Sequence, residues 1–389
     1  MKEMNQLESM TQGVQPISVN ERMDRIAKAR QLMEAKEIDA LLLEAGTTLE
    51  YFTGVRWSQS DRVAAAVIPA RGEIAYVCPT FEEARLREMM TIGDAVRTWE
   101  EHESPFQQIA QALADLGIRS GRIGVERATR YAVVDELGKA APRLEFSSAA
   151  PVVDPCRGIK SPAEIALMQR AMDVTIEAYK VCVEALREGM SQDEFRDLSA
   201  AAHRALGVRG HIDVQFGETT AFPHGSRETT YLKEGDVVLM DGGCSVEGYW
   251  SDISRTTVFG VPTSRQREVW ELEKAAQAAA FSAAKLGVAM ESVDAAARGV
   301  IVGAGFGPGY RVPGLPHRTG HGIGLDMHEP YNVVQGNTIP LAPGMCFSDE
   351  PMIVIYGEFG VRLEDCIYMS DKGPRFFTIP SPSIDQPFA

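Results

Sequence analysis

The chain has 389 residues, with 39 Lys and Arg against 54 Asp and Glu, so its formal net charge is −15. A strongly acidic surface repels phosphate backbones and anionic lipid headgroups, which argues against nucleic acid as a partner. The composition, 44% hydrophobic and 24% charged, is that of a globular protein, and the length exceeds what one hydrophobic core usually supports. We therefore expect two domains.

The cysteines and the hydropathy pattern bear on the compartment. No stretch approaches the roughly 18 consecutive apolar residues that span a bilayer, and the amino terminus is polar where a signal peptide would be apolar. The 6 cysteines are scattered singly, without a CxxC pair. This pattern favours buried free thiols over disulfides or a thiolate metal site. The sequence thus predicts a cytoplasmic protein with no membrane partner.

The first part of the chain alternates between helical and strand patterns. The first 15 residues lack periodicity and are expected to form a loose tail. From Asn20 apolar residues recur at helical spacing, and DALLLEA follows as a short strand. RVAAAVIP, EIAYVC and RIGVE are further predicted strands, and FEEARLREMM is a predicted helix. The alternation predicts an α/β domain over residues 1–156.

A second domain is predicted over residues 157–389. The junction PVVDPCRGIKSPAEIALMQRA contains two prolines and a glycine before a strong helix start. Ser161 begins a capping box with proline at the first helical position, and Ser191 begins a second capping box. The strand-like stretches VVLMDGG and SDISRTTVFG follow, then two helices between Ser264 and Gly303, then strand-rich sequence to the end. These helices and strands make up the predicted second domain.

Four carboxylates of the second domain stand in two pairs, each spaced for a β-hairpin. Asp241 ends an apolar strand, and Asp252 follows it beyond a Glu-Gly turn. Glu350 and Glu364 repeat the arrangement around the turn YGEFG. Such spacing suits carboxylates that face the same side of a hairpin. Between the two pairs lies HRTGHGIGLDMHEP, whose glycines allow the backbone to hold His321 closely.

The joint pattern predicts a two-metal hydrolase. Any single acid of this kind is most often a solvated hairpin residue. Four carboxylates that converge in a sheet, however, repel one another and stay partly protonated unless cations neutralise them, and two divalent ions would balance their charge. An oxygen-rich set with one imidazole suits hard or borderline ions such as Mn²⁺ better than a thiolate-bound zinc.

At these residues the chain resembles the pita-bread metallopeptidases, the family of prolidases, X-Pro aminopeptidases and methionine aminopeptidases. The resemblance runs over nearly the whole chain from about Asn20. The family's five metal ligands are all present, in the motifs MDGG, YWSDISRT, TGHGIG, SDEP and VRLED: Asp241, Asp252, His321, Glu350 and Glu364. The resemblance implies that Asp252 and Glu364 bridge two metals. Asp241 would chelate one ion, and His321 with Glu350 would complete the other.

The resemblance also implies the fold and the substrate. It implies a creatinase/prolidase-like α/β amino-terminal domain followed by an α+β pita-bread catalytic domain. Methionine aminopeptidases lack an amino-terminal domain of this size and creatinases replace the metal ligands, so a prolidase that cleaves Xaa-Pro dipeptides is expected. The alternatives are an X-Pro aminopeptidase for longer peptides, a non-peptidase amidohydrolase on the same fold and an inactive binding module. Two Mn²⁺ per subunit, with Co²⁺ or Zn²⁺ as alternatives, and a homodimer are expected.

Other residues match the family outside the metal set. His224 in AFPHG and His328 in DMHEP match its substrate-side histidines, His317 matches a further histidine position, and Arg362 matches an arginine that orients ligand carboxylates. Two metals would lower the pKa of a bridging water toward about 7. Glu350 would accept its proton as general base, while His224 and His328 would stabilise the oxyanion and help to protonate the imino nitrogen.

The chain departs from the family pattern near the expected substrate. Val354 stands where the family has a tyrosine, so another tyrosine, Tyr231 or Tyr249, is expected to reach toward the metals. Asp349, beside a predicted ligand, replaces a residue that is usually apolar, and either a loop role or a tuning role is open to it.

One more departure concerns the length of the substrate. Asn332 stands where some dipeptide-specific members carry an arginine that binds the substrate carboxylate. Arg318 or Arg227 is expected to serve instead; otherwise the pocket is open and longer peptides enter.

Overall fold

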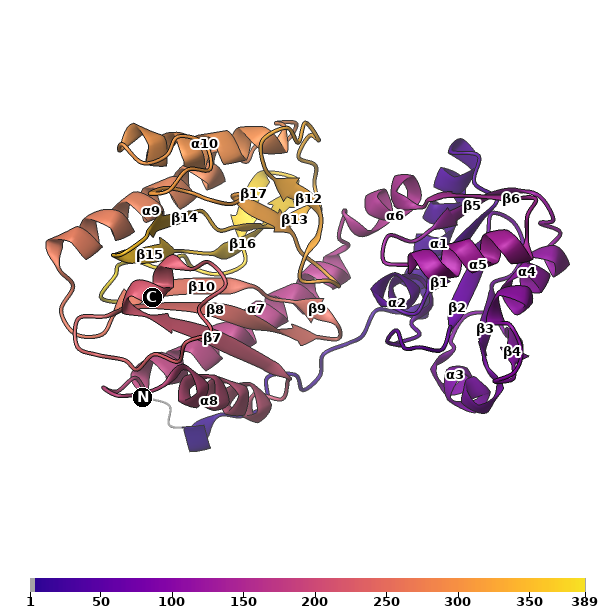
Figure 1. Cartoon of the computed structure of the whole chain (residues 1–389), viewed down its shortest axis with the longest axis horizontal. Coiled ribbons are helices and arrows are strands. Elements are labelled where there is room, and N and C mark those ends of the chain that lie inside the picture. Colours follow the sequence, from indigo (N-terminus) through magenta and orange to yellow (C-terminus); the bar gives the residue numbers. More distant parts are fainter. Residues whose placement is uncertain (1–3, 389) are drawn as a thin grey trace. The chain divides into compact units, whose positions relative to one another are not determined.

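A computed structural model describes residues 4–388 of the protein (Figure 1). The chain divides into two compact units, one from Pro16 to Arg157 and the other from Gly158 onward. The sequence predicts a boundary after residue 156, one residue earlier than this division. Arg157 belongs to the first unit because it is the last residue of the helix Ala150–Arg157.

Of the predicted loose tail, residues 1–3 lie outside the described residues, and residues 4–15 group with the second unit. The N–H of Met10 donates a hydrogen bond to the carbonyl of Leu206 at 2.9 Å. This contact between distant parts of the chain is not visible in a sequence pattern, since the segment lacks periodicity.

The first unit is a six-stranded sheet with helices. Its elements are α1 (Val19–Ala35), β1 (Ala40–Glu44), α2 (Thr47–Thr53), β2 (Ala65–Pro69), β3 (Ala75–Pro79), a 3₁₀ turn (Thr80–Glu82), α3 (Glu83–Met89), β4 (Ala95–Trp99), α4 (Pro105–Asp115), β5 (Gly121–Val125), α5 (Tyr131–Ala140), β6 (Leu144–Ser148) and α6 (Ala150–Arg157). The strand order is β4-β3-β2-β1-β5-β6. β1 pairs antiparallel with β2 and parallel with β5.

The central strands are hydrophobic on both faces. All residues of β1, β2 and β3 are buried, as expected for strands covered on two sides. On one face, α4 and α5 contribute Ile109, Leu113 and Leu137 to a core that includes Leu42 and Val67. The α/β prediction for this domain therefore agrees with the structure.

The second unit begins with a short 3₁₀ turn at Met4–Gln6 and continues after Arg157. Its further elements are α7 (Pro162–Glu184), α8 (Gln192–Ala205), β7 (Gly210–Phe216), a 3₁₀ turn (Gly217–Ala221), β8 (Val237–Val246), β9 (Tyr249–Trp250), β10 (Ile253–Val258), α9 (Ser264–Ala283), α10 (Met290–Gly303), β11 (Gly320–Gly322), β12 (Glu329–Val333), β13 (Cys346–Asp349), β14 (Met352–Ile355), β15 (Phe359–Arg362), β16 (Asp365–Ser370) and β17 (Gly373–Phe376). Both predicted capping boxes are confirmed, at Ser161 and Ser191.

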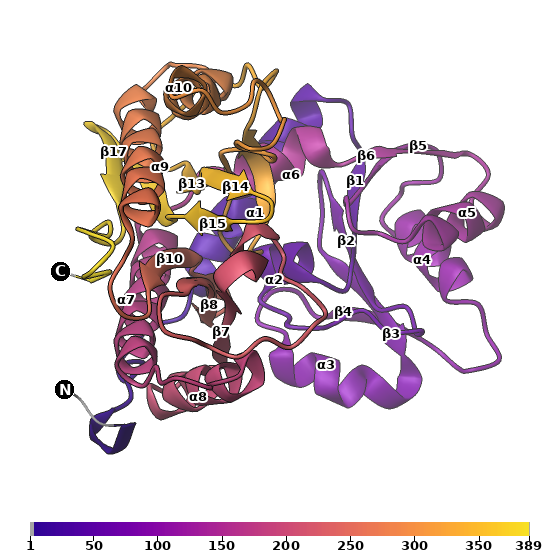
Figure 2. The ribbon, with the colours of Figure 1, turned by 60° about the vertical axis from the view of Figure 1, so that its left-hand side comes forward.

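The strands of this unit form two main sheets and a hairpin. One sheet has the order β10-β8-β7, with β9 paired to β8, and the other has the order β12-β11-β13-β16-β17. β14 and β15 form a separate antiparallel pair. Figure 1 shows α9 and α10 on one side of the strands and α7 and α8 on the other, and Figure 2 shows the same arrangement after rotation.

The core of this unit packs α9 and α10 against the strands. Trp270 of α9 and Ile301 of α10 are fully buried together with Phe347, Ile353 and Ile367. The indole N–H of Trp270 donates to the carbonyl of Thr256 at 2.9 Å, so its one polar atom is satisfied. Among the residues that the structure describes, no helix combines the length and apolarity needed to cross a bilayer.

Candidate metal centre and its surroundings

The four predicted carboxylates lie on or next to two β-hairpins. Asp241 lies on β8 opposite Ser254 of β10, and Asp252 lies immediately before β10. The second hairpin is β14 and β15, and the chain places Glu350 before it and Glu364 after it. The backbones of Ser254 and Glu364 exchange hydrogen bonds of 3.3 and 3.1 Å, which joins the two hairpins at the site.

His321 enters the site on β11, a strand flanked by glycines. A Cβ added at Gly320 would lie 1.9 Å from the Ser348 carbonyl oxygen, and one at Gly322 would lie 1.9 Å from that of Pro330. Only glycine fits such close approaches of neighbouring backbones. The glycines therefore allow β12 and β13 to pack on either side of His321, as the sequence predicts.

The five predicted ligands lie in one cluster. Ligand atoms of Asp252, His321 and Glu364 all lie within 4.8 Å of one another. The Nε2 atom of His321 is 3.2 Å from Oε1 of Glu350 and 3.6 Å from Oδ2 of Asp252. The Ser254 hydroxyl is 3.0 Å from Oδ1 of Asp241 and 2.7 Å from Oε2 of Glu364.

Burial and mutual repulsion disfavour the charged forms of these acids. Burial raises the pKa of Asp252 well above its usual range, and Asp241 and Glu350 raise it further. The pKa of Glu364 is raised in the same way, first by burial and then by Asp252 and Glu350. Arg362 opposes both shifts. Arg362 thus faces several carboxylates at once, so the cluster has an excess of negative charge.

The donor atoms fit a divalent cation. Oε1 of Glu364 is buried and has no hydrogen-bond partner among residues 4–388, a costly state for a carboxylate unless a cation binds it. His321 Nδ1 lies 3.0 Å from the Gly322 carbonyl, which can only accept, so Nδ1 carries the proton and Nε2 keeps its lone pair. Burial lowers the pKa of His321 to about 4, so the imidazole is neutral at pH 7 and able to coordinate a metal.

These pKa directions predict an unusual pH dependence for metal-free protein. Because the pKa values of Asp252 and Glu364 are higher in the folded state, these two carboxyls bind more protons in the folded than in the unfolded chain above about pH 4, and their contribution to stability falls as pH rises. The lowered pKa values of His317 and His321 oppose this gain below about pH 6.5, so we expect metal-free protein to gain stability relative to metal-loaded protein as pH falls from about 7 to about 5. Bound cations keep the carboxylates ionised, so metal-loaded protein should gain less. Urea unfolding of both forms at both pH values measures this, and equal gains would contradict it.

Arg362 and Ser254 form a layer behind the carboxylates. Arg362 NH2 is 2.6 Å from Oδ2 of Asp241, and its Nε donates to the Ser254 hydroxyl at 2.9 Å. Arg362 therefore lies where an arginine that orients ligand carboxylates is expected. Ser254 is a residue that the sequence reasoning missed, although it stands two positions after Asp252 in the motif SDISRT.

The predicted substrate-side histidines surround this cluster. His328 is exposed, and its ring centroid lies 4.2 Å from that of His321. His224 is exposed in the loop after Gly217–Ala221. The Nε2 atom of His317 is buried without a partner among residues 4–388, and burial lowers the pKa of this histidine. Glu350 and His224 also act on His317 electrostatically, so these three side chains belong to one neighbourhood.

The two tyrosines that the sequence offers as candidates make the following contacts. Tyr231 is 58% exposed, and the hydroxyl of Tyr249 donates to Oε1 of Glu164 at 2.9 Å. These contacts give no support to the expectation that either phenol reaches the metals. Tyr179 of α7 is fully buried, and its pKa is raised first by burial and then by Asp241. Its hydroxyl, however, donates to the Ile253 carbonyl.

Two buried acids beside the cluster could not be assigned from sequence. Asp349 lies on β13 with 1% exposure, so it is not a loop residue. Glu273 of α9 is fully buried, and neither acid has a hydrogen-bond partner for its carboxyl oxygens among the described residues. Burial raises the pKa of each carboxyl well above its usual range.

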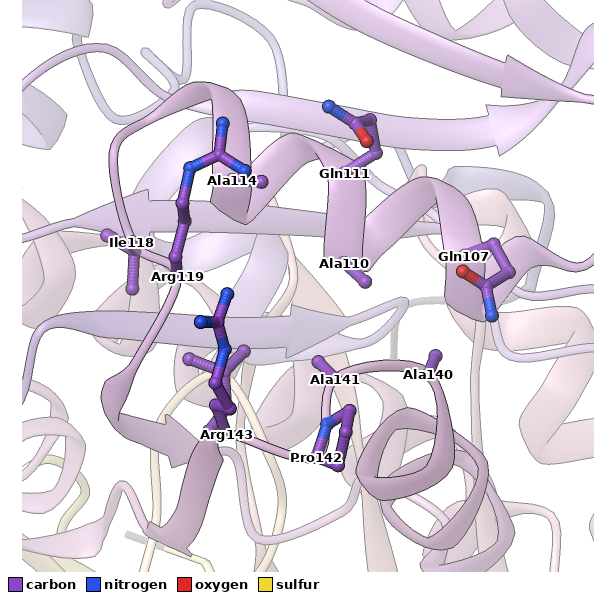
Figure 3. A pocket seen from close by; sticks show the side chains of 11 residues that line it. Gln107, Ala110, Gln111, Ala114, Ile118, Arg119, Ala140, Ala141, Pro142 and Arg143 are labelled. Carbon is purple, nitrogen blue, oxygen red and sulfur yellow. The ribbon is translucent and has the colours of Figure 1, made fainter.

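A separate pocket of about 220 Å³ lies in the first unit. Figure 3 shows two arginines at its edge, Arg119 before β5 and Arg143 before β6, with alanines and a proline around them. Both arginines are exposed, and no histidine or carboxylate lines the pocket. It therefore has no group suited to metal-dependent hydrolysis.

Comparison with known proteins agrees with this geometry. The model of metallopeptidase family M24 matches residues 166–371, and the model of the creatinase/prolidase N-terminal domain matches residues 25–159. The chain belongs to metallopeptidase family M24. The predicted pairing of a creatinase-type amino-terminal domain with a pita-bread catalytic domain is therefore confirmed.

Relatives of this M24 peptidase match it along nearly their whole length. It is 31% identical to an Xaa-Pro dipeptidase of Lactobacillus helveticus, over 90% of this chain and 95% of that protein. The structure of dipeptidase PepE from Mycobacterium ulcerans matches with a TM-score of 0.88 at 30% identity, covering 96% and 100% of the two chains. A prolidase from Thermococcus sibiricus matches with a TM-score of 0.85 at 28% identity, covering 92% and 97%.

Proposed function

We propose that the protein is a prolidase, a dinuclear-metal hydrolase that cleaves the Xaa-Pro bond of dipeptides through a hydroxide. The observation that carries the proposal is the convergence of Asp252, His321 and Glu364, with Glu350 and Asp241 beside them. Its support from relatives is the likeness to proteins named Xaa-Pro dipeptidase and prolidase.

The five clustered residues would hold two divalent ions. Asp241, Asp252, Glu350 and Glu364 would supply carboxylate ligands, and His321 would supply the imidazole. When bound, the ions would polarise the scissile carbonyl and lower the pKa of a water toward about 7. Mn²⁺ is the proposed metal because the donor set is rich in oxygen, with Co²⁺ and Zn²⁺ as alternatives.

Glu350 is the proposed general base. Its Oε1 lies 3.1 Å from the Ser348 hydroxyl, which also accepts a hydrogen bond from the His321 N–H, so the carboxylate is held beside the cluster. Glu350 would take a proton from the attacking water and pass it to the imino nitrogen of the leaving proline. An Xaa-Pro amide nitrogen carries no hydrogen, so the site needs no acceptor for it.

His224 and His328 are the proposed oxyanion donors. Although His328 is exposed on one side, partial desolvation of its ring lowers its pKa, and the neighbouring His321 and Arg318 lower it further, so its imidazole is neutral at pH 7. A neutral imidazole offers one N–H, which would donate to the oxyanion as charge develops there. His224 would approach the same atom from the opposite loop.

Arg318 is the proposed binding group for the substrate carboxylate. It is half-buried, whereas Arg227 is exposed. Its NH1 donates to Oδ1 of Asn332 at 3.0 Å, and no carboxylate lies within ion-pair distance of it among residues 4–388. The same arginine lowers the pKa values of His321 and His328, so its charge acts on the site. A cation free to bind an anion at this position favours dipeptides over longer chains.

A substrate panel tests the proposal. We expect Mn²⁺-loaded protein to cleave Ala-Pro, to cleave Ala-Pro-Ala more slowly because its carboxylate lies beyond Arg318, and to cleave Ala-Ala poorly. Product release measured by chromatography gives kcat/KM for each peptide. A rate on the tripeptide equal to that on the dipeptide would favour the X-Pro aminopeptidase alternative. Failure to cleave any Xaa-Pro bond would favour a non-peptidase amidohydrolase.

The compartment and the assembly complete the proposal. We infer a cytoplasmic enzyme, since all six cysteines are free and buried, as suits a reducing compartment. We also infer a homodimer, from the family resemblance, and sedimentation analysis of the purified protein tests it.

A further inference from the structure

An ion pair on helix α10 lies next to the chain segment 315–319, which contains Arg318. Arg298 and Asp294 are four residues apart on the helix, and their side chains are 11% and 2% exposed. The guanidinium contacts the carboxylate through two atoms, with NH2 at 2.9 Å from Oδ1 and Nε at 3.1 Å from Oδ2. Such a two-point contact fixes the orientation of both groups.

The pair binds the backbone on both sides of Arg318. Arg298 donates to the carbonyls of Leu315 and His317, each at 2.9 Å, and to that of Gly309. Asp294 Oδ1 accepts from the N–H of Thr319 at 3.2 Å and from its hydroxyl at 2.7 Å. The residues immediately before and after Arg318 are therefore both attached to α10.

Other backbone contacts also hold this segment: Gly314 and Val354 exchange hydrogen bonds of 3.1 and 3.0 Å, and Thr319 donates to the Val333 carbonyl at 3.0 Å. The carbonyls of Leu315 and His317, by contrast, are bound by Arg298. Neither helix nor strand lies between the end of α10 at Gly303 and the start of β11 at Gly320. The guanidinium of Arg298 also lies over the ring of Tyr310, 4.4 Å from its centroid. A buried ion pair seldom adds net stability over apolar side chains. The main effect of this pair is therefore to fix the position of the segment that it binds. Small displacements of a binding group cost large factors in rate, so this position bears on function.

We propose that Asp294 and Arg298 are positioning residues that fix where the Arg318 guanidinium lies. They thereby select substrates whose residue after the scissile bond carries a free carboxylate. The inference rests on the proposed prolidase function and on the proposed role of Arg318. The side chain of Asn332 accepts a hydrogen bond from the Arg318 guanidinium. The α10 pair binds the backbone of His317 and Thr319, the residues on either side of Arg318.

The experiment compares Ala-Pro with Ala-Pro amide, which lacks the carboxylate. We expect wild-type enzyme to prefer the free acid. Arg298→Met should lower kcat/KM for Ala-Pro by about tenfold, the scale of a lost charge-assisted hydrogen bond, through KM more than kcat, and should change the amide little. The matched control is Arg267→Met. It removes an exposed arginine of α9 whose NH2 donates to Oδ1 of Asp385 at 2.7 Å. This control should keep the wild-type preference.

A double variant separates positioning from stability. If Arg298 acts through Arg318, Arg298→Met combined with Arg318→Met should lose no more acid preference than Arg318→Met alone. Additive losses, or equal losses on acid and amide, would overturn the inference. If Arg298→Met does not fold, Arg298→Lys serves, because one ammonium replaces only part of the five-donor set.

Failure of the inference is distinguishable from failure of the proposed function. Wild-type enzyme that cleaves acid and amide equally would overturn the role of Arg318 and of the α10 pair while Xaa-Pro cleavage stands. Wild-type enzyme that cleaves neither would overturn the prolidase proposal itself.

Discussion

Glu364→Gln is expected to remove bound metal and to lower Xaa-Pro cleavage by on the order of a thousandfold or more. Glu364 is 1% exposed, and its Oε1 has no partner among residues 4–388. An amide at this position keeps the volume but supplies a neutral oxygen where two cations would share a carboxylate. Asp252→Asn should behave in the same way, because its side chain lies in the same cluster.

Metal content separates ligands from substrate-side residues. Plasma emission on purified variants should show fewer ions per chain in Glu364→Gln and Asp252→Asn, whereas His224→Ala, an exposed loop histidine, should keep the wild-type content. Chelation of wild-type protein should abolish activity, and Mn²⁺ or Co²⁺ should restore it. Full activity in metal-free protein would refute the dinuclear site. A filled site in Glu364→Gln beside an empty one in His224→Ala would reverse the division between the two groups of residues.

The sequence allowed the cluster to be predicted because local motifs carry its members. Asp241 and Asp252 stand on one hairpin, and Glu350 and Glu364 flank another, so each pair follows from turn spacing alone. The glycines around His321 are also part of a local motif. A Cβ at either position would collide with a neighbouring backbone. Their proposed roles as ligands stay predictions that the metal analysis tests.

Contacts between distant segments could not be predicted in this way. Ser254 joins two carboxylates because β10 pairs with the chain at Glu364, a contact 110 residues apart that no hairpin rule describes. Glu273 lies on a helix whose sequence gives no sign that this acid faces inward. The exposure of Tyr231 likewise depends on how its loop packs, which residue type alone does not determine.

The most destabilising single change that we expect is Lys160→Met. Lys160 Nζ lies 2.8 Å from Oε2 of Glu329, and both side chains are 2% exposed. Glu329 Oε1 accepts from the N–H groups of Leu325 and Asp326 at 3.0 and 3.2 Å, which closes the turn that contains His328. Removal of the ammonium takes this charge partner from a buried carboxylate, and we expect the free energy of unfolding to fall by about 3 kcal/mol.

A second variant shows whether this cost arises from the charge of Glu329. In Lys160→Met with Glu329→Gln, the glutamine oxygen still accepts from the turn but carries no charge, so most of the lost stability should return. Urea unfolding gives the stabilities, and hydrogen exchange of the Leu325 and Asp326 amides reports on the turn itself. Lys139→Met, which removes an exposed lysine beside Asp135, should change neither measurement. A double variant as unstable as Lys160→Met would instead assign the loss to packing of the lysine chain. Because His328 lies within this turn, between Asp326 and Glu329, faster exchange there should be accompanied by a lower kcat, and unchanged catalysis would show that the turn does not position His328.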